Sequence, residues 1–109
     1  MAEKKTAEER RIELQHIFED ILGSKNVYFQ PPETQKLKYP CILYFKSNAR
    51  AWFADDIKYI RRQGYTVTLV EYDPDSDLEE RISEALTFTR TDSYYRSEGL
   101  NHTKLTIFY

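Results

Sequence analysis

The stretch YTVTLVEYDPDSDLEERISEAL, residues 65–86, contains the change from strand to helix on which the fold depends. Its first eight residues are rich in β-branched and aromatic side chains, and Val67 and Leu69 alternate with threonines as in a half-buried β-strand. Pro74 ends that strand, and apolar residues then recur at helical spacing from Leu78. The sequence therefore predicts a strand, an acidic turn and a second helix.

The acidic turn contains three alternating aspartates, Asp73, Asp75 and Asp77. Together with Glu84 they have the spacing of calcium ligands in an EF-hand loop, which surrounds the ion with oxygen atoms. Such a loop also requires glycine at its sixth position and a helix in front, whereas this chain has Leu78 and a strand. We therefore expect no calcium site, and we interpret Asp77 as the N-cap of a helix whose Glu80 completes a capping box.

The composition indicates one small folded unit. A chain of 109 residues with 40% hydrophobic content supports a single domain, residues 1–109, with one modest core. Its one cysteine, Cys41, lies in the apolar run CILYF, where a buried and unreactive thiol is expected. The charged start MAEKKTAEERR lacks the apolar region of a signal peptide, and no apolar stretch is long enough to span a bilayer. We therefore expect a protein that works in a cytoplasm or an intracellular assembly.

The net charge of −2 conceals an uneven distribution of charge along the chain. Residues 36–62 carry seven basic side chains against two acidic ones, whereas residues 71–80 carry six acidic side chains and no basic one. We therefore expect one side of the molecule to be basic and another to be acidic, without an overall attraction to nucleic acid or anionic lipid.

An N-terminal helix is predicted by a capping box formed by Thr6 and Glu9 and by a stop at Gly23. Its apolar positions recur at helical spacing and are Leu14, Ile17, Phe18, Ile21 and Leu22. His16 lies beside this stripe without a second histidine or cysteine at ligand spacing, so we expect it to be structural. Residues 26–30 are compatible with a short strand, and the two prolines that follow interrupt it.

Four further segments have the composition of strands: residues 38–46, 65–72, 88–95 and 104–109. Two helices and about four strands predict an α+β fold, with an antiparallel or mixed sheet covered by the N-terminal helix and the second helix.

Residues 47–64 form a connection that is too long for a tight turn and that mixes aromatic residues with both signs of charge. We expect a long extended hairpin loop that protrudes from the domain. Trp52 and Phe53 either fold back onto the core or anchor a partner, because aromatic residues supply much of the energy of protein interfaces.

Catalytic motifs are missing from the sequence. With three glycines the chain has no phosphate-binding loop, and His102 has no companion that would make it a proton shuttle. We therefore expect no enzyme activity, no cofactor and no metal.

The segment RRQGY, residues 61–65, resembles the RNA-stacking strand of an RRM domain only loosely, because Val67 stands where that motif has an aromatic residue. The order of the predicted elements also differs from βαββαβ. A small nucleic-acid-binding module with a basic, aromatic strand edge stays open as an alternative, although basic residues also protect strand edges from aggregation.

Three segments of the chain are characteristic in order and spacing: KYPCILY at residues 38–44, GYTVTLVEYDPDSDL at 64–78 and GLNHTKLTIFY at 99–109. The shorter segments FADD at residues 53–56 and KNVYFQPPE at 25–33 accompany them. Together they resemble a family of small tail-completion proteins from long-tailed bacteriophages and prophages, over most of the chain from about residue 20 onward. Members of that family typically carry a basic residue before the tyrosine that matches Tyr65, where this chain has Gly64.

The resemblance implies a structural virion protein of the tail or neck, a tail terminator or a neighbouring head-tail joining protein, that assembles in the cytoplasm of a host bacterium. Such a subunit forms a ring, expected to be a hexamer, on the end of the tail tube and offers a surface to the head connector. The expected partners are further copies of the chain, the major tail tube protein and a head completion or connector protein. DNA is expected only as the genome passing through the lumen, and no membrane is expected.

Opposed charge patches suit a closed ring, because one face of each subunit meets a different face of the next. We expect residues 47–64 to reach a neighbouring subunit or the tube, with complementary charge guiding the encounter. The expected contact residues are Arg50, Trp52, Phe53, Lys58, Tyr59, Arg61 and Arg62. The expected acidic partner patch consists of Asp73, Asp75, Asp77, Glu79 and Glu80.

Overall fold

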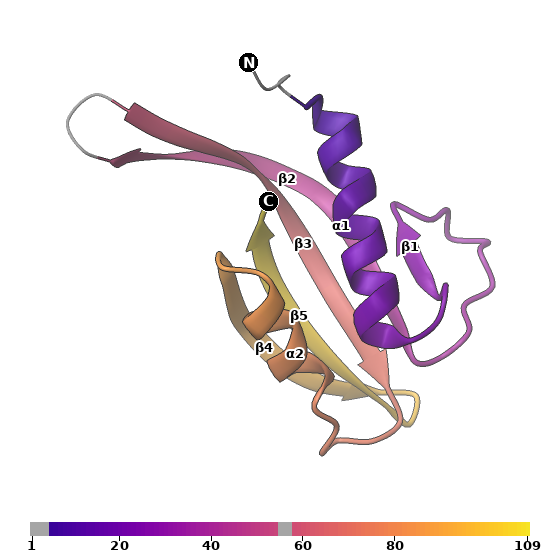
Figure 1. Ribbon diagram of the computed structural model, residues 1–109. Helices are drawn as coiled ribbons and strands as arrows, with labels where there is room; N and C mark the ends of the chain where they lie inside the picture. The colour runs from indigo at the N-terminus through magenta and orange to yellow at the C-terminus, as the bar shows by residue number, and fades with distance from the viewer. Residues whose placement is uncertain (1–4, 55–57) are drawn as a thin grey trace.

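The computed structural model describes residues 5–54 and 58–109, and it describes side chains for residues 5–50 and 61–109. Within these residues two helices cover one face of a five-stranded sheet (Figure 1). The elements in chain order are α1 (Ala7–Leu22), β1 (Val27–Phe29), β2 (Cys41–Ala54), β3 (Lys58–Glu71), α2 (Leu78–Ala85), β4 (Thr89–Ser97) and β5 (Leu100–Phe108). The predicted α+β class is confirmed, and the short segment expected at residues 26–30 joins the sheet as its fifth strand.

The sheet is mixed, with the spatial order β1-β2-β3-β5-β4. Only its first pair, β1 with β2, is parallel among the described strands, and the other neighbours are antiparallel. A two-residue turn joins β4 to β5, with Glu98 at φ 54° and Gly99 at φ 77°. Both angles lie in the left-handed region that two-residue hairpin turns need, which explains the glycine at the second turn position.

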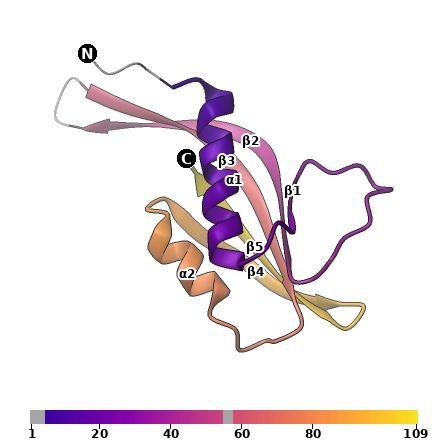
Figure 2. The ribbon, with the colours of Figure 1, turned by 45° about the vertical axis from the view of Figure 1, so that its right-hand side comes forward.

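The core lies between the helices and the sheet face that they cover (Figures 1 and 2). Leu14 and Phe18 of α1 and Ile82 of α2 are fully buried there. The sheet contributes alternate residues of its central strands, because successive side chains of a strand point to opposite faces. These residues are Ile42, Tyr44, Tyr65, Val67, Leu69, Leu105 and Ile107.

The two ends of α1 agree with the prediction. The Thr6 hydroxyl accepts the N–H of Glu9 at 3.1 Å, and the Glu9 carboxylate accepts the N–H of Thr6 at 3.0 Å. This reciprocal pair satisfies two of the N–H groups that a helix start leaves without partners. Gly23 ends the helix in the left-handed conformation, with φ 75°.

The start of α2 differs from the prediction, because the side chain of Asp77 makes no capping hydrogen bond. The backbone of Asp77 has φ −94° and ψ 9°, outside the extended region from which a capping side chain reaches the helix N–H groups. Instead, the hydroxyl oxygen of Ser76 accepts the N–H of Leu78 at 3.4 Å. Asp73 accepts the N–H of Asp75 at 2.9 Å and so shapes the turn itself. The predicted capping box of Asp77 and Glu80 was therefore wrong.

The two long central strands have different limits from those predicted. Strand β2 begins at Cys41, three residues later than predicted. Pro40 has no N–H to donate to a neighbouring strand, and the N–H of Lys38 donates to the hydroxyl of Tyr28 at 3.2 Å. At the other end, β2 and β3 continue into the segment expected to be a loop and pair as far as Ala54 and Lys58. Residues 55–57, which connect them, lie outside the described residues. Neither described helix has both the length and the apolar character needed to cross a membrane.

Candidate functional site

The β2–β3 hairpin extends beyond the sheet as an arm, which we define as residues 48–54 and 58–63. β5 pairs with β3 from Gly64 onward, and the N–H of Tyr109 donates to the Gln63 carbonyl oxygen at 2.9 Å. Within the described residues, the arm strands beyond Gln63 pair only with each other. Figure 1 shows the arm at one end of the molecule and the turn before α2 at the other end. The arm and the acidic turn are therefore far apart in one subunit, whose longest dimension is 49 Å. The start of the segment predicted to be basic lies near the acidic turn instead, where the ring centroids of Tyr39 and Tyr72 are 6.3 Å apart.

The base of the arm is a bulge in β2, where the pairing shifts between Ser47 and Arg50. A Cβ atom on Gly64 would lie 2.3 Å from the carbonyl oxygen of Asn48 and 2.8 Å from the Ser47 hydroxyl. The side-chain amide of Gln63 closes the same bulge by donating to the carbonyl oxygens of Ser47 and Gly64. Gly64 is therefore required for a close backbone approach, because any side chain at this position would meet the backbone of Asn48.

Three of the predicted contact residues are described on the arm. Arg50 lies directly opposite Arg62, and Arg61 lies opposite Ala51, so the two opposed arginines share one face and Arg61 lies on the other. Arg50 and Arg61 are exposed, and Arg62 is half-buried and donates to the carbonyl oxygen of Arg61 at 3.3 Å. The arm therefore brings three arginines close together.

The other four predicted contact residues belong to strands of the arm by their backbone. Trp52 pairs with Ile60, Phe53 with Tyr59, and Ala54 with Lys58. The side chains of Trp52, Phe53, Lys58 and Tyr59 lie outside the described residues, so their roles stay predictions.

The acidic patch gathers around the turn that leads into α2. Four of its side chains are exposed, namely Asp73, Asp75, Asp77 and Glu80. Glu79 is held in place, since one of its carboxylate oxygens accepts the hydroxyls of Thr91 and Tyr94, both at 2.6 Å. These bonds join α2 to β4, and the hydrogen bond to Glu79 raises the pKa of Tyr94.

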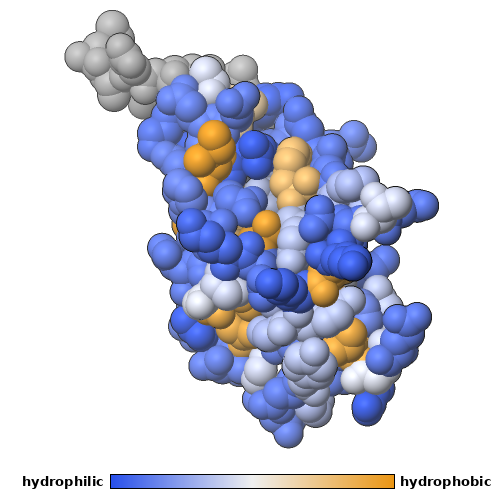
Figure 3. Space-filling view, turned by 90° about the vertical axis from the view of Figure 1, so that its right-hand side faces the viewer, coloured by the Kyte–Doolittle hydropathy of each residue, from blue (hydrophilic) through white to orange (hydrophobic). Residues whose placement is uncertain are grey.

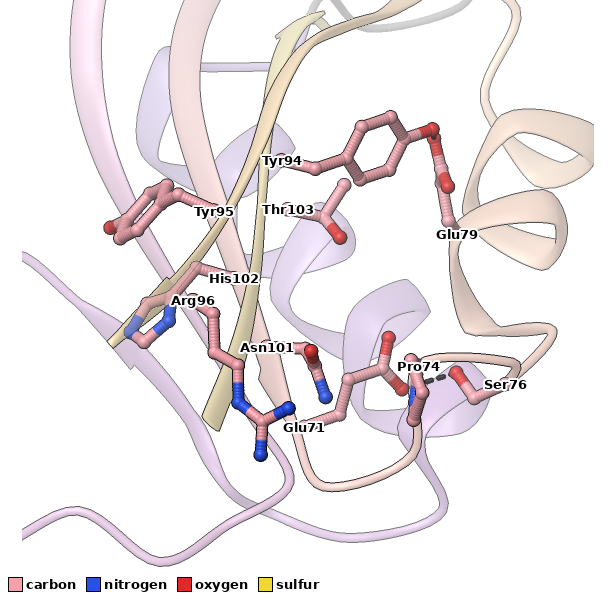
Figure 4. Close-up of a pocket in the computed structure, with 10 residues that line it drawn as sticks. All are labelled: Glu71, Pro74, Ser76, Glu79, Tyr94, Tyr95, Arg96, Asn101, His102 and Thr103. Carbon is pink, nitrogen blue, oxygen red and sulfur yellow. Dashed lines mark hydrogen bonds between the residues drawn. The ribbon is translucent and has the colours of Figure 1, made fainter. Parts of the chain in front are cut away.

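A pocket of about 420 Å³ lies next to this patch, between the turn before α2 and the adjoining ends of β4 and β5 (Figure 4). Its side chains come from segments far apart in the sequence, and they include Glu71, Ser76, Glu79, Tyr94, Arg96 and Asn101. Sequence reasoning missed it, because no local pattern links the end of β3 to the β4–β5 hairpin.

Glu71 is the most buried charged residue of the pocket, with 8% of its surface exposed. One of its carboxylate oxygens accepts the hydroxyl of Ser76, and the other has no hydrogen-bond partner within the described residues (Figure 4). Burial raises the pKa of the Glu71 carboxyl, and the negative charges of Asp73, Glu79 and Asp77 raise it further. The pocket is therefore electrostatically suited to a cation.

Metal binding is not supported in the part of the chain that the structure describes, where no three histidine, cysteine, aspartate or glutamate side chains are grouped for an ion. The aspartates of the turn thus form no EF-hand-like cage there. Cys41 is fully buried, and burial raises the pKa of its thiol to about 11. An un-ionised thiol is a poor nucleophile and a poor metal ligand, which agrees with the predicted structural role.

The sheet face away from the helices carries exposed aromatic and basic side chains. Tyr95 stacks on His102 with ring centroids 4.5 Å apart, and the Lys104 ammonium lies 5.9 Å from the Tyr95 ring. Phe45, at 42% exposure, lies on the same face of β2. Figure 3 shows a different side of the molecule, where apolar side chains occur in small separate groups among hydrophilic ones. That side offers no continuous apolar patch of the kind that marks an interface.

Comparison with known proteins yields no assignment: the chain matches no protein-family model, and no curated protein is significantly similar to it in sequence. The resemblance drawn from its segments therefore stays a prediction.

Proposed function

We propose that this chain is a tail terminator of a long-tailed bacteriophage or prophage, a structural subunit that forms a ring on the end of the tail tube and joins it to the head connector. The observation that carries the proposal is the position of the basic arm and the acidic patch at opposite ends of one subunit. A ring is built from such heterologous contacts, in which the arm of one copy meets the acidic patch of the next.

The limited stability of the arm by itself also supports the proposal that it contacts a partner. A two-stranded hairpin without a third strand is marginally stable in water. Contact with an acidic surface would bury part of the arm and place carboxylates near its arginines.

The segments that carry the family resemblance also support the proposal by their place in the fold. They fall on β2, β3 and β5, which are consecutive neighbours at the centre of the sheet. The resemblance thus concerns the core of the domain. The partners proposed with it are the major tail tube protein, a head completion or connector protein and further copies of the chain, in the virion tail or neck.

Self-association of the purified chain tests the proposal. We expect rings that form with rising concentration in sedimentation velocity and that are visible by negative-stain electron microscopy. Changing Arg61 and Arg62 to Glu should weaken association by about tenfold or more, because charge reversal turns attraction into repulsion across the contact. The matched control is Lys36→Glu, an exposed charge reversal outside the arm. A chain that stays monomeric at every concentration, alone and with polymerised tail tubes, would refute the proposal.

A second candidate, a nucleic-acid-binding module, is favoured by one observation: the open sheet face carries Phe45, the Tyr95–His102 stack and Lys104. Aromatic side chains on a sheet can stack on single-stranded bases, and cations contact the phosphates. Binding of single-stranded DNA or RNA that falls steeply with salt would support this candidate, because phosphate contacts release counterions.

A further inference from the structure

We infer that the pocket lined by Glu71 and Glu79 is a receptor for a guanidinium group, and that Arg61 on the arm of the neighbouring copy supplies it. This inference rests on the proposed function for the identity of the partner. It goes beyond that function by naming one pocket and one side chain.

The pocket has an acceptor set that a guanidinium group can use. Glu79 is fixed by Thr91 and Tyr94 through one carboxylate oxygen, which leaves its other oxygen without a partner in the described part of the chain. Glu71 likewise has one oxygen committed to Ser76 and one available (Figure 4). A planar guanidinium group with five N–H donors can bond to free carboxylate oxygens of this kind, and charge-assisted bonds are about twice as strong as neutral ones.

The charge around the pocket favours a cation that comes from outside. Glu71 is nine-tenths buried, and the negative charges of Asp73, Glu79 and Asp77 act on it. Arg96 also lines the pocket, but it is exposed and forms no ion pair with either glutamate among the described residues. One guanidinium group and two carboxylates line the pocket, and Asp73 and Asp77 add negative charge beside it, so an incoming cation would reduce a local excess of negative charge.

The available space and ligand set suit an organic cation better than a metal ion. The described residues contain no group of three ligands of the kind that a metal ion requires. A pocket of about 420 Å³ is large enough for the end of an arginine side chain.

The arm of the same copy cannot supply this cation, because the arm and the turn before α2 lie at opposite ends of a molecule 49 Å long (Figures 1 and 2), and residues of that turn line the pocket. Among the arm arginines, Arg61 is exposed and lies on the face away from Arg50 and Arg62. We therefore assign Arg61 as the side chain that enters the pocket. The arm of one copy would therefore contact the pocket of the next copy, in a head-to-tail arrangement.

The first test measures the pocket alone, without self-association. Arginine methylamide is titrated into the isotope-labelled protein, and citrulline methylamide, which has the same shape without the charge, serves as the matched probe. We expect saturable NMR shifts at Thr91, Tyr94 and Asn101 with arginine methylamide and at least tenfold smaller affinity for the citrulline probe. The double variant E71Q/E79Q keeps one acceptor oxygen on each side chain and removes both charges, so it should lose the preference, whereas E84Q, on the exposed side of α2, should keep it. Equal binding of both probes, or no shift at the pocket, would overturn the inference.

The second test asks whether Arg61 is the natural occupant. The variant R61E retains the pocket, and the variant E71Q/E79Q retains the arm. Each alone should fail to form rings, whereas their mixture should form 1:1 dimers that grow no further, because one intact contact remains. Wild-type rings that are unchanged by both variants would overturn the inference and leave the terminator proposal standing. A monomeric wild type that still binds arginine methylamide would contradict the terminator proposal and leave the pocket standing.

Discussion

At the scale of single residues, Gly64 shows how a side chain can be excluded by the backbone of a neighbouring strand. Its φ angle is not in the left-handed region, so the requirement for glycine is steric. The nearest atom to an added Cβ is the carbonyl oxygen of Asn48, which cannot move away as the end of a flexible side chain could. The bulge that starts the arm therefore depends on this glycine.

We predict that Gly64→Ala destabilises the protein by about 1–3 kcal/mol, as overpacking of a close-packed site does. Chemical denaturation measures the change. Adding Ser47→Ala should not restore stability, because it removes the hydroxyl and leaves the 2.3 Å approach to the Asn48 carbonyl. Full recovery in the double variant would show that the side chain, and not the bulged backbone, sets the requirement.

Glu71 is a residue whose ionisation opposes folding. Its pKa is raised by burial and by neighbouring carboxylates, so the folded state holds the proton more tightly than the unfolded state does. The contribution of Glu71 to the free energy of unfolding is therefore fully present below the ordinary glutamate pKa of about 4.3. That contribution is lost as the pH rises through the higher pKa of the folded state. A buried carboxylate that costs stability at neutral pH is consistent with a functional role.

We predict that Glu71→Gln raises the melting temperature at pH 7, because Gln keeps an acceptor for Ser76 and carries no charge. The gain should shrink as the pH falls and disappear near pH 4, where the parent carboxyl is protonated in both states. Thermal melts between pH 4 and pH 8 measure it, with Glu84→Gln as an exposed control on α2. A pH-independent difference, or a loss of stability at pH 7, would contradict this reading of Glu71.

At the scale of elements, the two helices begin in different ways despite similar sequence signals. Thr6 caps α1 with its side chain, whereas Asp77 stands at the start of α2 without a side-chain hydrogen bond. The difference arises in the turn before α2, where Asp73 and Ser76 already bind the local N–H groups and fix the backbone of Asp77 outside the extended region. A capping-box sequence therefore predicts where a helix starts, but it does not predict which side chain accepts the first N–H groups of the helix.

We predict that Thr6→Ala costs about 1 kcal/mol in the free energy of unfolding, the typical value for loss of an N-cap. Asp77→Ala should cost less than about 0.5 kcal/mol, because only a favourable charge near the helix start is lost. Urea denaturation of both variants measures the contrast. Equal costs at the two positions would mean that Asp77 caps α2 in solution.

At the scale of the whole molecule, folding and association are assigned to different parts of the chain. Every residue of the described core cluster lies outside residues 48–63. The described arm carries Arg50, Arg61 and Arg62, and the acidic patch and its pocket lie at the opposite end of the sheet. We therefore expect the domain to fold without the arm, and we expect the arm to serve contacts between molecules.

We predict that replacing residues 48–63 by the two-residue turn Asn-Gly leaves a folded domain, because Ser47 and Gly64 are already paired and such a turn closes a hairpin. Far-ultraviolet circular dichroism and a cooperative melt would show the fold. Ring formation should be lost altogether. An armless chain that still forms rings would place the subunit contact elsewhere on the molecule.

The sequence by itself determined the features that a few neighbouring residues control. Thr6 and Gly23 set the ends of α1, Pro74 ends the region of β3, and Gly99 allows the tight turn between β4 and β5. The α+β class also followed, because the periodicity of apolar residues differs between helices and strands. The uneven distribution of basic and acidic residues could likewise be read along the chain.

Only the tertiary structure decided what depends on residues distant in sequence. It set the strand order β1-β2-β3-β5-β4, the bulge that requires Gly64, and the pocket in which Glu71 meets residues of β4 and β5. It also showed that the expected loop continues β2 and β3 as paired strands. The physical reason is that local signals arise from conformational preference and spacing within a few residues, whereas register, close approach and burial of charge arise only when separate strands pack together.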